Sequence, residues 1–393
     1  MDVLEAGEAT LRSAEAGPGG EQILRYAARG QPGAITCRFD PNQGGTVRLT
    51  GLSSSRDGEL SPAALFFLET YWLGRAAAVA GPALGPAAYL AQQIVNATAP
   101  AAVYALLALG YSLIYGLIGR VNLAFGEFCA MGTLAALAGA LLAGPAGAVA
   151  AVLPLGLALG AAAHALVVRP LLRRTSQAFL VASLGLSLAM SEGMRLAQGS
   201  RGQWLPPGLA RPVHLWQAGK EGGASVAVSA GGLLAAALAA AAFLGVWYLM
   251  RRTAFGRAWR ACADDPGAAA LVGVDTDRTA RGASLLAGAC ATLAGAVVAL
   301  HYGIVGFDAG LLLGFKALTA AVVGGIGSPT GAALGGALIG LIETLWAAYL
   351  PGAWREVAIF GLLAATLVLR PHGLLGQPSG RENPMLWRGR ENG

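Results

Sequence analysis

The sequence predicts an all-α fold: a polytopic helical membrane protein with about eight to ten transmembrane or re-entrant helices, each crossing helix needing roughly 20 apolar residues. Three observations support this prediction. Of the 393 residues, 55% are hydrophobic and only 12% are charged, about half the charged fraction of soluble domains, which is near 25%. The 58 glycines are small residues that let membrane helices pack closely. The net charge of +6 comes from basic residues beside apolar runs, as expected of membrane topology rather than nucleic-acid binding.

The N-terminal part differs from the rest. Residues 1–60 begin with an acidic stretch that lacks the basic and apolar regions of a signal peptide. The alternating segments 34–39 and 46–49 flank a turn-rich DPNQGG and predict a β-hairpin. This N-terminal extension is therefore either a small hairpin-containing appendage or a disordered segment. Residues 61–88 are apolar but carry charged and aromatic residues, so they form either an interfacial helix or an extra transmembrane helix.

The main membrane domain is predicted to follow, over residues 89–377. Two of its apolar runs, 126–144 and 310–326, are glycine-rich or short, which is typical of broken or re-entrant helices beside a transport pathway. The candidate spans are 95–118, 126–144, 146–168, 178–197, 226–249, 283–302, 310–326, 331–350 and 355–370.

Arginine-rich connections predict the orientation. The loops 169–177 and 251–281 are the most basic short connections, and two spans separate them, so both are expected in the cytoplasm. The connection 198–225 is then external, and residues 378–393 form a cytoplasmic tail.

The charged loop 251–281 contains six arginines and four aspartates, which excludes it from the lipid interior. Within it, residues 266–272 predict a short helix: Asp264 and Asp265 offer capping oxygens, Pro266 suits the first helical position and Gly273 ends the helix. Such a helix suits recognition by a protein outside the membrane. The alternative is an ordinary loop whose arginines only fix topology.

Three polar residues within apolar segments are candidates for the translocation path. Asn122 and Glu127 lie where one span ends and the next begins, so Glu127 either lines a break in the pathway or caps a helix near the surface. Lys316 lies inside an apolar run and either faces the path or extends to the interface. Closely spaced glycines predict helix packing at Gly324, Gly325, Gly327, Gly331 and Gly335.

No catalytic or metal-binding pattern is present. The sequence lacks a phosphate-binding G-x-x-x-x-G-K-[ST] loop, a G-x-S-x-G elbow and an H-E-x-x-H helix. The four cysteines and four histidines are scattered without ligand spacing. We therefore expect no enzyme activity, no metal and no cofactor in this chain.

Four segments carry a resemblance to a known family: GLIGRVNLAFGEFCAMG (116–132), RACADDPGAAALVGVDTDR (260–278), GFKALTAAVVGGIGSPTGAALGG (314–336) and VLRPHGLLG (368–376). In this order they resemble the branched-chain amino acid ABC transporter permeases, and most closely the LivH-type subunit. One departure is Phe125, where the family usually has histidine before the Gly-Glu pair. If that histidine lines the path, substrate or proton sensitivity differs here.

The resemblance implies a permease subunit of an ATP-driven importer in the bacterial inner membrane. Its partners would be a second, homologous permease subunit, two cytoplasmic ATPase subunits that bind the ATP, and an external solute-binding protein that delivers branched-chain amino acids. Urea or short amides are alternative substrates, and an ion-coupled secondary transporter is the alternative mechanism. By the same analogy, the ATPase-coupling segment comprises Arg260, Ala261, Cys262, Ala263, Asp264, Asp265, Gly273 and Asp275.

Overall fold

The computed structural model describes residues 10–16, 21–28, 31–40, 48–54, 58–59, 86–171, 175–198, 203–204, 212–217, 225–302, 304–305, 309–350 and 352–376. The chain forms two units, Met1–Leu84 and Gly85–Gly393. Most of the predicted interfacial or transmembrane segment 61–88, and the predicted tail 378–393, lie outside the described residues.

The N-terminal unit contains a five-stranded antiparallel sheet whose strands follow one another in sequence order. The segments predicted to form a hairpin lie in the third and fourth strands, which pair from Ile35 opposite Ser54 to Asp40 opposite Arg48. The strands are β1 (Thr10–Ala16), β2 (Glu21–Ala28), β3 (Gln31–Asp40), β4 (Arg48–Ser54) and β5 (Gly58–Glu59).

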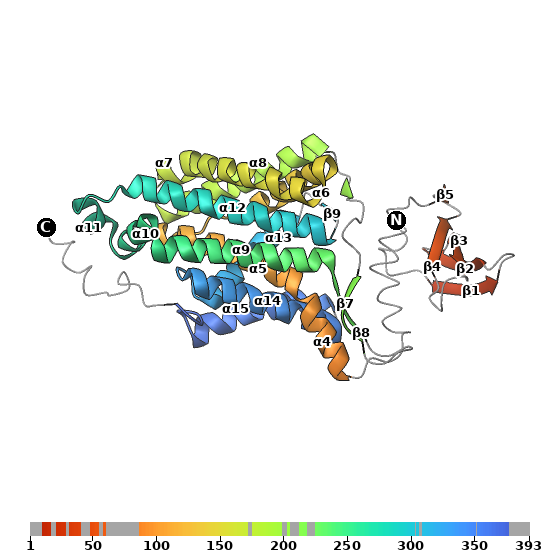
Figure 1. Cartoon of the computed structure of the whole chain (residues 1–393). Helices are drawn as coiled ribbons and strands as arrows, with labels where there is room; N and C mark the ends of the chain where they lie inside the picture. Colours follow the sequence, from red (N-terminus) through yellow and green to blue (C-terminus); the bar gives the residue numbers. More distant parts are fainter. Residues whose placement is uncertain are drawn as a thin grey trace. The chain divides into compact units, whose positions relative to one another are not determined.

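The second unit is a helical bundle with a few short strands (Figure 1). Its helices are α4 (Pro86–Asn96), α5 (Thr98–Ile118), α6 (Phe125–Ala163), α7 (Arg169–Leu171), α8 (Ser176–Gln198), α9 (Ala230–Arg252), α10 (Ala254–Asp264), α11 (Pro266–Leu271), α12 (Thr276–Tyr302), α13 (Ala309–Gly324), α14 (Pro329–Tyr349) and α15 (Arg355–Leu369). The π-helical turn η2 (His164–Val168) and the 3-10 turn η3 (Gly352–Trp354) extend α6 and precede α15. The strands are β6 (Gln203–Trp204), β7 (Pro212–Gln217), β8 (Ser225–Ser229) and β9 (Ile304–Val305), paired β6–β9 and β7–β8.

The prediction of a polytopic helical membrane protein is confirmed. Seven helices in the described part of the chain are long and apolar enough to cross a membrane, and Gly310–Gly324 is a shorter apolar helix. The seven are Tyr89–Ile118, Phe125–Gly144, Ala146–Leu171, Ser176–Ala197, Gly231–Arg252, Thr276–Tyr302 and Pro329–Tyr349. With α13 and the 15-residue α15, each of the predicted spans corresponds to a helix.

Three starts of the predicted spans are wrong. The span predicted at 283–302 already begins at Thr276 as α12. The first crossing segment begins at Tyr89 rather than residue 95, because the polar residues Gln92, Gln93 and Asn96 lie within α4, which continues into α5 through Ala97 in helical conformation. The predicted span 226–249 is a helix only from Ala230, because residues 225–229 form β8 and pair with β7. β-branched and small residues in SVAVS suit a strand as well as a helix.

Helix α6 contains a chain reversal that separates two of the predicted spans. Ala143 and Gly144 leave helical geometry, and Gly144 has φ +63°, a conformation that favours glycine. A Cβ atom at Gly139 would lie 2.3 Å from the Gly147 carbonyl oxygen. The two halves of α6 therefore fold back on each other as an antiparallel pair.

Helices α5 and α12 form the centre of the bundle. In the most apolar stretch of α12, 78% of the residues are buried, against 17% in α9. Small residues set this packing: a Cβ atom at Gly110 of α5 would lie 3.2 Å from the Ala287 carbonyl oxygen, and one at Gly288 would lie 2.2 Å from that of Gly156. Such contacts bring helix backbones close enough for extensive dispersion contact.

We expect Gly336→Ala to destabilise the bundle by roughly 1–3 kcal/mol, the usual range for overpacking. The new Cβ would lie 2.3 Å from the Ala105 nitrogen and 2.4 Å from its Cα, so α14 would have to move away from α5. Thermal unfolding of the purified protein in detergent measures this effect. The matched control is Gly245→Ala in α9, where no atom lies within 4 Å of the new methyl. Equal melting temperatures for the two variants would contradict the close packing.

Candidate functional site

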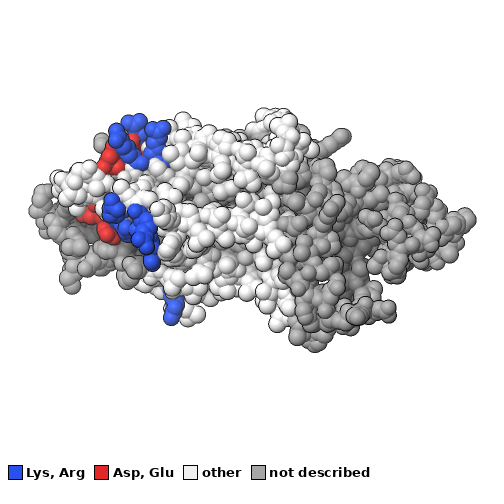
Figure 2. Space-filling view, in the orientation of Figure 1, with Lys and Arg blue, Asp and Glu red and all other residues white. Residues whose placement is uncertain are grey.

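The predicted short helix forms at the end of the bundle that carries the basic loops. Arg169 Nε lies 3.9 Å from Asp277 Oδ1, which places the loops 169–177 and 251–281 at one end, as expected. We call this the basic end. On the surface visible in Figure 2, basic side chains (blue) and acidic side chains (red) gather there, whereas β7 and β8 lie at the opposite end (Figure 1).

Helix α10 is fastened to the bundle by one tryptophan. Trp259 Nε1 donates to the Leu113 carbonyl of α5 at 2.9 Å, and its ring fills the space beside Gly116, where a Cβ would lie 2.5 Å from ring carbon Cζ2. Arg260 donates to the Met250 carbonyl at the end of α9. Cys262 is buried, and burial raises the pKa of its thiol, so it stays protonated. Helix α10, in the first half of the loop 251–281, is thus attached to α5.

Helix α11 is shaped by local residues. Asp265 Oδ1 accepts from the backbone N–H groups of Gly267 and Ala268 at 2.7 and 3.1 Å, and Pro266 occupies the first turn. The helix ends at Leu271, one residue earlier than predicted, and Gly273 has φ +88°. Asp264 does not cap α11, because it is the last residue of α10.

Leu271, the last residue of α11, and the following Val272 form an exposed apolar surface that we call the apolar tip. Leu271 is 91% exposed and Val272 is 79% exposed, whereas Ala269, on the other side of the helix, is buried. Directly after the tip, Asp275 caps α12 by accepting from the backbone N–H of Arg278 at 2.9 Å. The apolar tip therefore lies between two capped helices, α11 before it and α12 after it.

The break between α5 and α6 buries two polar residues with unsatisfied groups. Glu127, in the first turn of α6, is 2% exposed, and Asn122 is 1% exposed. Glu127 Oε1 accepts from Ser187 Oγ of α8 at 3.3 Å, and Asn122 Oδ1 accepts from the Ala124 N–H at 3.0 Å. Glu127 Oε2 and Asn122 Nδ2 have no hydrogen-bond partner. Glu127 therefore does not lie at an exposed helix end.

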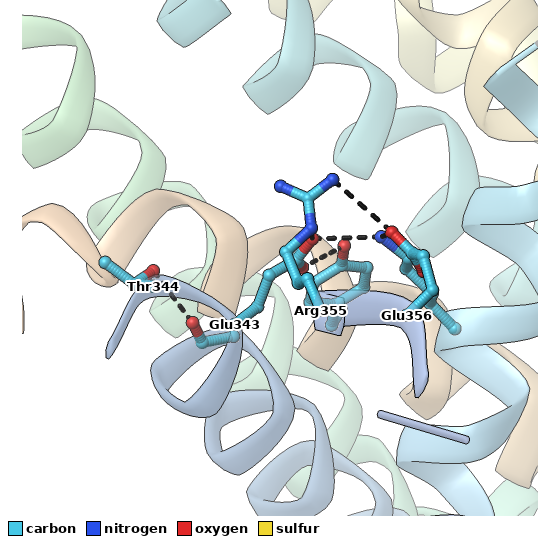
Figure 3. A network of polar contacts seen from close by, with 7 residues as sticks. Glu343, Thr344, Arg355 and Glu356 are labelled. Atoms are coloured by element: carbon cyan, nitrogen blue, oxygen red, sulfur yellow. Dashed lines mark hydrogen bonds and ion pairs between the residues drawn. The ribbon is translucent and has the colours of Figure 1, made fainter. Parts of the chain in front are cut away.

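Lys316 belongs to a separate cluster. Its Nζ lies 2.9 Å from Glu343 Oε1 and 2.7 Å from Glu356 Oε1, and its side chain is 5% exposed. Arg355 contacts the same two carboxylates at 3.3 Å each, as Figure 3 shows from close by. Tyr104 of α5 donates to Glu343 Oε2 at 2.5 Å. Lys316 is buried and paired instead of extending to the interface.

Of this cluster, the sequence analysis identified only Lys316. Its members come from α5, α13, α14 and α15, and Lys316 is 27 residues from Glu343. The signal that sequence reasoning missed is Glu343 itself, an acidic residue within the predicted span 331–350. Ser187, the partner of Glu127, has no distinguishing sequence context.

The predicted packing glycines fall into two groups. Gly324, Gly331 and Gly335 lie between α13 and α14, where a Cβ atom at any of them would lie 2.1 to 2.5 Å from a carbonyl oxygen of the other helix. Gly325 and Gly327 have φ of +111° and +90° and form the turn between these helices. Leu374 and Leu375 donate their N–H groups to the Val323 and Gly324 carbonyls at 2.9 Å each, which holds the segment after α15 against this turn.

These features are those of a multi-pass membrane protein. The chain is a multi-pass membrane protein with polar groups inside its bundle, and its described residues contain no group of His, Cys, Asp or Glu that could hold a metal. The chain belongs to the family of branched-chain amino acid transport system permease components, whose model matches residues 93–367. It is thus a transport subunit of the ABC transporter class, similar to bacterial inner-membrane permeases, and not an enzyme.

Similar proteins come from several bacteria. The high-affinity branched-chain amino acid transport system permease protein LivH of Escherichia coli K12 is 32% identical over 301 residues, covering 74% of this chain and 96% of LivH. BraD of Pseudomonas aeruginosa, named for the same transport system, is 32% identical over 297 residues, with coverage of 73% and 96%. The autoinducer 2 import permease LsrC of Klebsiella pneumoniae is 38% identical over 139 residues, 34% of this chain and 40% of LsrC. No solved structure matches the chain significantly.

Proposed function

We propose that this chain is the permease subunit of an ATP-driven importer that moves branched-chain amino acids across the inner membrane. It would pair with a second, homologous permease subunit, two cytoplasmic ATPase subunits that bind ATP, and an external binding protein that delivers the substrate. The names of LivH and BraD support the substrate, since the match covers 96% of each. The match to LsrC covers only 40% of that protein.

One observation supports the coupling role most directly: the exposed apolar tip on a loop that is anchored to the bundle. Leu271 and Val272 present apolar surface away from the bundle, and apolar surface that is rimmed by charged residues marks protein contact sites. Arg260, Asp264 and Asp265 are exposed charged residues of the same loop. The ATPase would bind this tip at the segment 260–275.

The anchors give motion of the tip a route into the membrane. Trp259 ties α10 to the Leu113 carbonyl in α5, and Asp275 caps α12 directly after the tip. Because α5 and α12 form the buried centre of the bundle, movement of α10 and α11 on ATPase closure would shift these helices together. Coupling of this kind requires a rigid element whose two positions are biased by a partner.

The translocation path would pass the break between α5 and α6. There, Asn122 Nδ2 and Glu127 Oε2 lack hydrogen-bond partners among the described residues. Lys316 is satisfied by Glu343 and Glu356, so in this conformation it would hold α13 in place rather than contact substrate.

The decisive experiment is ATP hydrolysis by the assembled transporter in nanodiscs. We expect the leucine-loaded binding protein to stimulate hydrolysis several-fold over the substrate-free binding protein. Stimulation by urea or a short amide alone would keep the importer and replace the substrate. If no ATPase subunit binds while every partner is folded, and leucine uptake follows an ion gradient, the importer mechanism is wrong and ion-coupled transport replaces it.

A further inference from the structure

The break between α5 and α6 holds an unsatisfied hydrogen-bond acceptor and an unsatisfied donor. Glu127 Oε2 is an acceptor without a partner, and Asn122 Nδ2 is a donor without a partner. The orientation of the Asn122 amide follows from its Oδ1, which accepts from the Ala124 N–H. Burying either group unpaired costs free energy, so two complementary unpaired groups in one break indicate a ligand.

Among the residues that the structure describes, no cation forms an ion pair with Glu127. Within the described residues, its carboxylate accepts one hydrogen bond, from the neutral Ser187 hydroxyl. Lys316 lies two positions after Gly314 in α13, about 200° around a helix of 3.6 residues per turn, and Gly314 faces Gly126. Lys316 therefore points to the opposite side of α13, where it already contacts two carboxylates.

The donor set excludes a divalent metal. Ca²⁺ takes six to eight oxygen ligands and Mg²⁺ requires six in an octahedron, whereas this break offers one carboxylate and one amide. The described residues contain no group of three or more metal-ligating side chains. A cation with directional N–H donors, such as a primary ammonium, needs only a few acceptors.

We propose that the break between α5 and α6 binds the zwitterionic head of an α-amino acid, with Glu127 Oε2 accepting from the ammonium group and Asn122 Nδ2 donating to the carboxylate. This inference rests on the proposed function and makes it narrower: the head group is recognised by charge, so urea, amides and sugars are poor ligands. Ser187 holds the Glu127 carboxylate in position by donating to its Oε1 atom.

Helix α13 covers the site in this conformation. A Cβ atom at Gly310 would lie 2.5 Å from Glu127 Oε2, and one at Gly126 would lie 1.9 Å from the Gly310 carbonyl oxygen. Tyr111 Oη, which also lacks a partner, faces the same side of α13, 3.4 Å from the Cβ position of Gly314. The amino acid therefore enters only when α13 moves away from α6.

The first test needs no substitution. The complete transporter without binding protein is heated in detergent with leucine or with 4-methylpentanoate, which has the same carbon skeleton and no amino group. A ligand that binds only the folded state raises the melting temperature. We therefore expect leucine to raise the melting temperature of the transporter by about 2 °C or more, a shift that is large enough to measure. We expect no shift with 4-methylpentanoate. Equal shifts, or none with leucine, would overturn the assignment.

The second test uses isosteric variants. We expect Glu127→Gln to lose the leucine shift and at least ten-fold of leucine uptake. Asn122→Asp, which places a negative charge beside the substrate carboxylate, should lose uptake similarly. The controls are Glu192→Gln, an exposed glutamate of α8 paired with Arg195, and the exposed Asn96→Asp.

The outcomes separate the two proposals. If the unaltered complex takes up leucine and Glu127→Gln does so equally well, Glu127 is a neutral structural group, and the head-group site is wrong while the importer stands. If the unaltered complex takes up no leucine under conditions in which all partners bind, both proposals fail. Should neither variant assemble, the comparison of leucine with 4-methylpentanoate on the unaltered complex still decides.

Discussion

Replacing Leu271 with aspartate should release the ATPase subunits from the membrane complex. Leu271 is 91% exposed at the apolar tip, so docking would bury nearly its whole side chain, a gain of roughly 2 kcal/mol. Aspartate would forfeit that gain and add a charge to be desolvated. Since each 1.4 kcal/mol is a factor of ten in affinity, we expect binding to weaken at least about 30-fold, as for an interface hot spot.

The measurement is co-purification of the ATPase with the tagged permease, followed by titration of the ATPase in nanodiscs. Leu350→Asp is the matched control: Leu350 is 47% exposed and lies directly after α14, at the end of that helix away from the turn at Gly327. Membrane insertion should be normal in both variants. Undiminished ATPase binding by Leu271→Asp would mean that the docking site lies elsewhere.

Replacing Lys316 with methionine should destabilise the bundle more than Gly336→Ala. Within the described part of the chain, the change leaves Arg355 as the one cation paired with Glu343 and Glu356. Removing one partner of a buried ion pair costs about 3–5 kcal/mol, because the other charge stays buried and unpaired. Glu343, 12% exposed, is too enclosed for water to compensate. We therefore expect a clear drop in melting temperature and a lower yield of folded protein.

A double variant tests the cause. Lys316→Met combined with Glu343→Gln removes one positive and one negative charge and leaves the Arg355–Glu356 pair, so we expect it to recover most of the lost stability. Arg195→Met is the control, because it breaks only a surface pair with Glu192, worth roughly 0–1 kcal/mol. A double variant no more stable than the single one would show that Lys316 acts through packing and not through charge.

Local signals in the sequence predicted local structure well. Asp265, Pro266 and Gly273 predicted the start and end of α11 because capping, a fixed proline φ and a positive φ depend on neighbouring residues only. The crossing helices followed from run length for the same reason, since lipid requires every backbone group to bond within its own segment. The predicted start of the span at residue 226 was wrong, because residues 225–229 form β8, which is a strand only through its pairing with β7.

The candidate site could be predicted only in part. Asn122, Glu127 and Lys316 stood out as polar residues in apolar surroundings, but the sequence grouped them together. The structure places Lys316 against Glu343 and Glu356 and leaves Glu127 with Ser187 alone. Which of these groups is satisfied depends on the face that α13 turns to α6 and the face that it turns to α14.

The sequence by itself determined the class of protein, the crossing segments, the basic end and the capped helix at its tip. Only the tertiary structure decided that Trp259 attaches the preceding helix, α10, to α5 across 146 residues of sequence, that four charges from three helices neutralise one another, and that one oxygen of a carboxylate and the nitrogen of an amide in one break remain unpaired. The physical reason is range. Hydropathy and capping act over a few residues, whereas the satisfaction of a buried charge depends on which helix faces pack against each other, and small residues such as Gly126 and Gly314 fix those faces through contacts far apart in the chain.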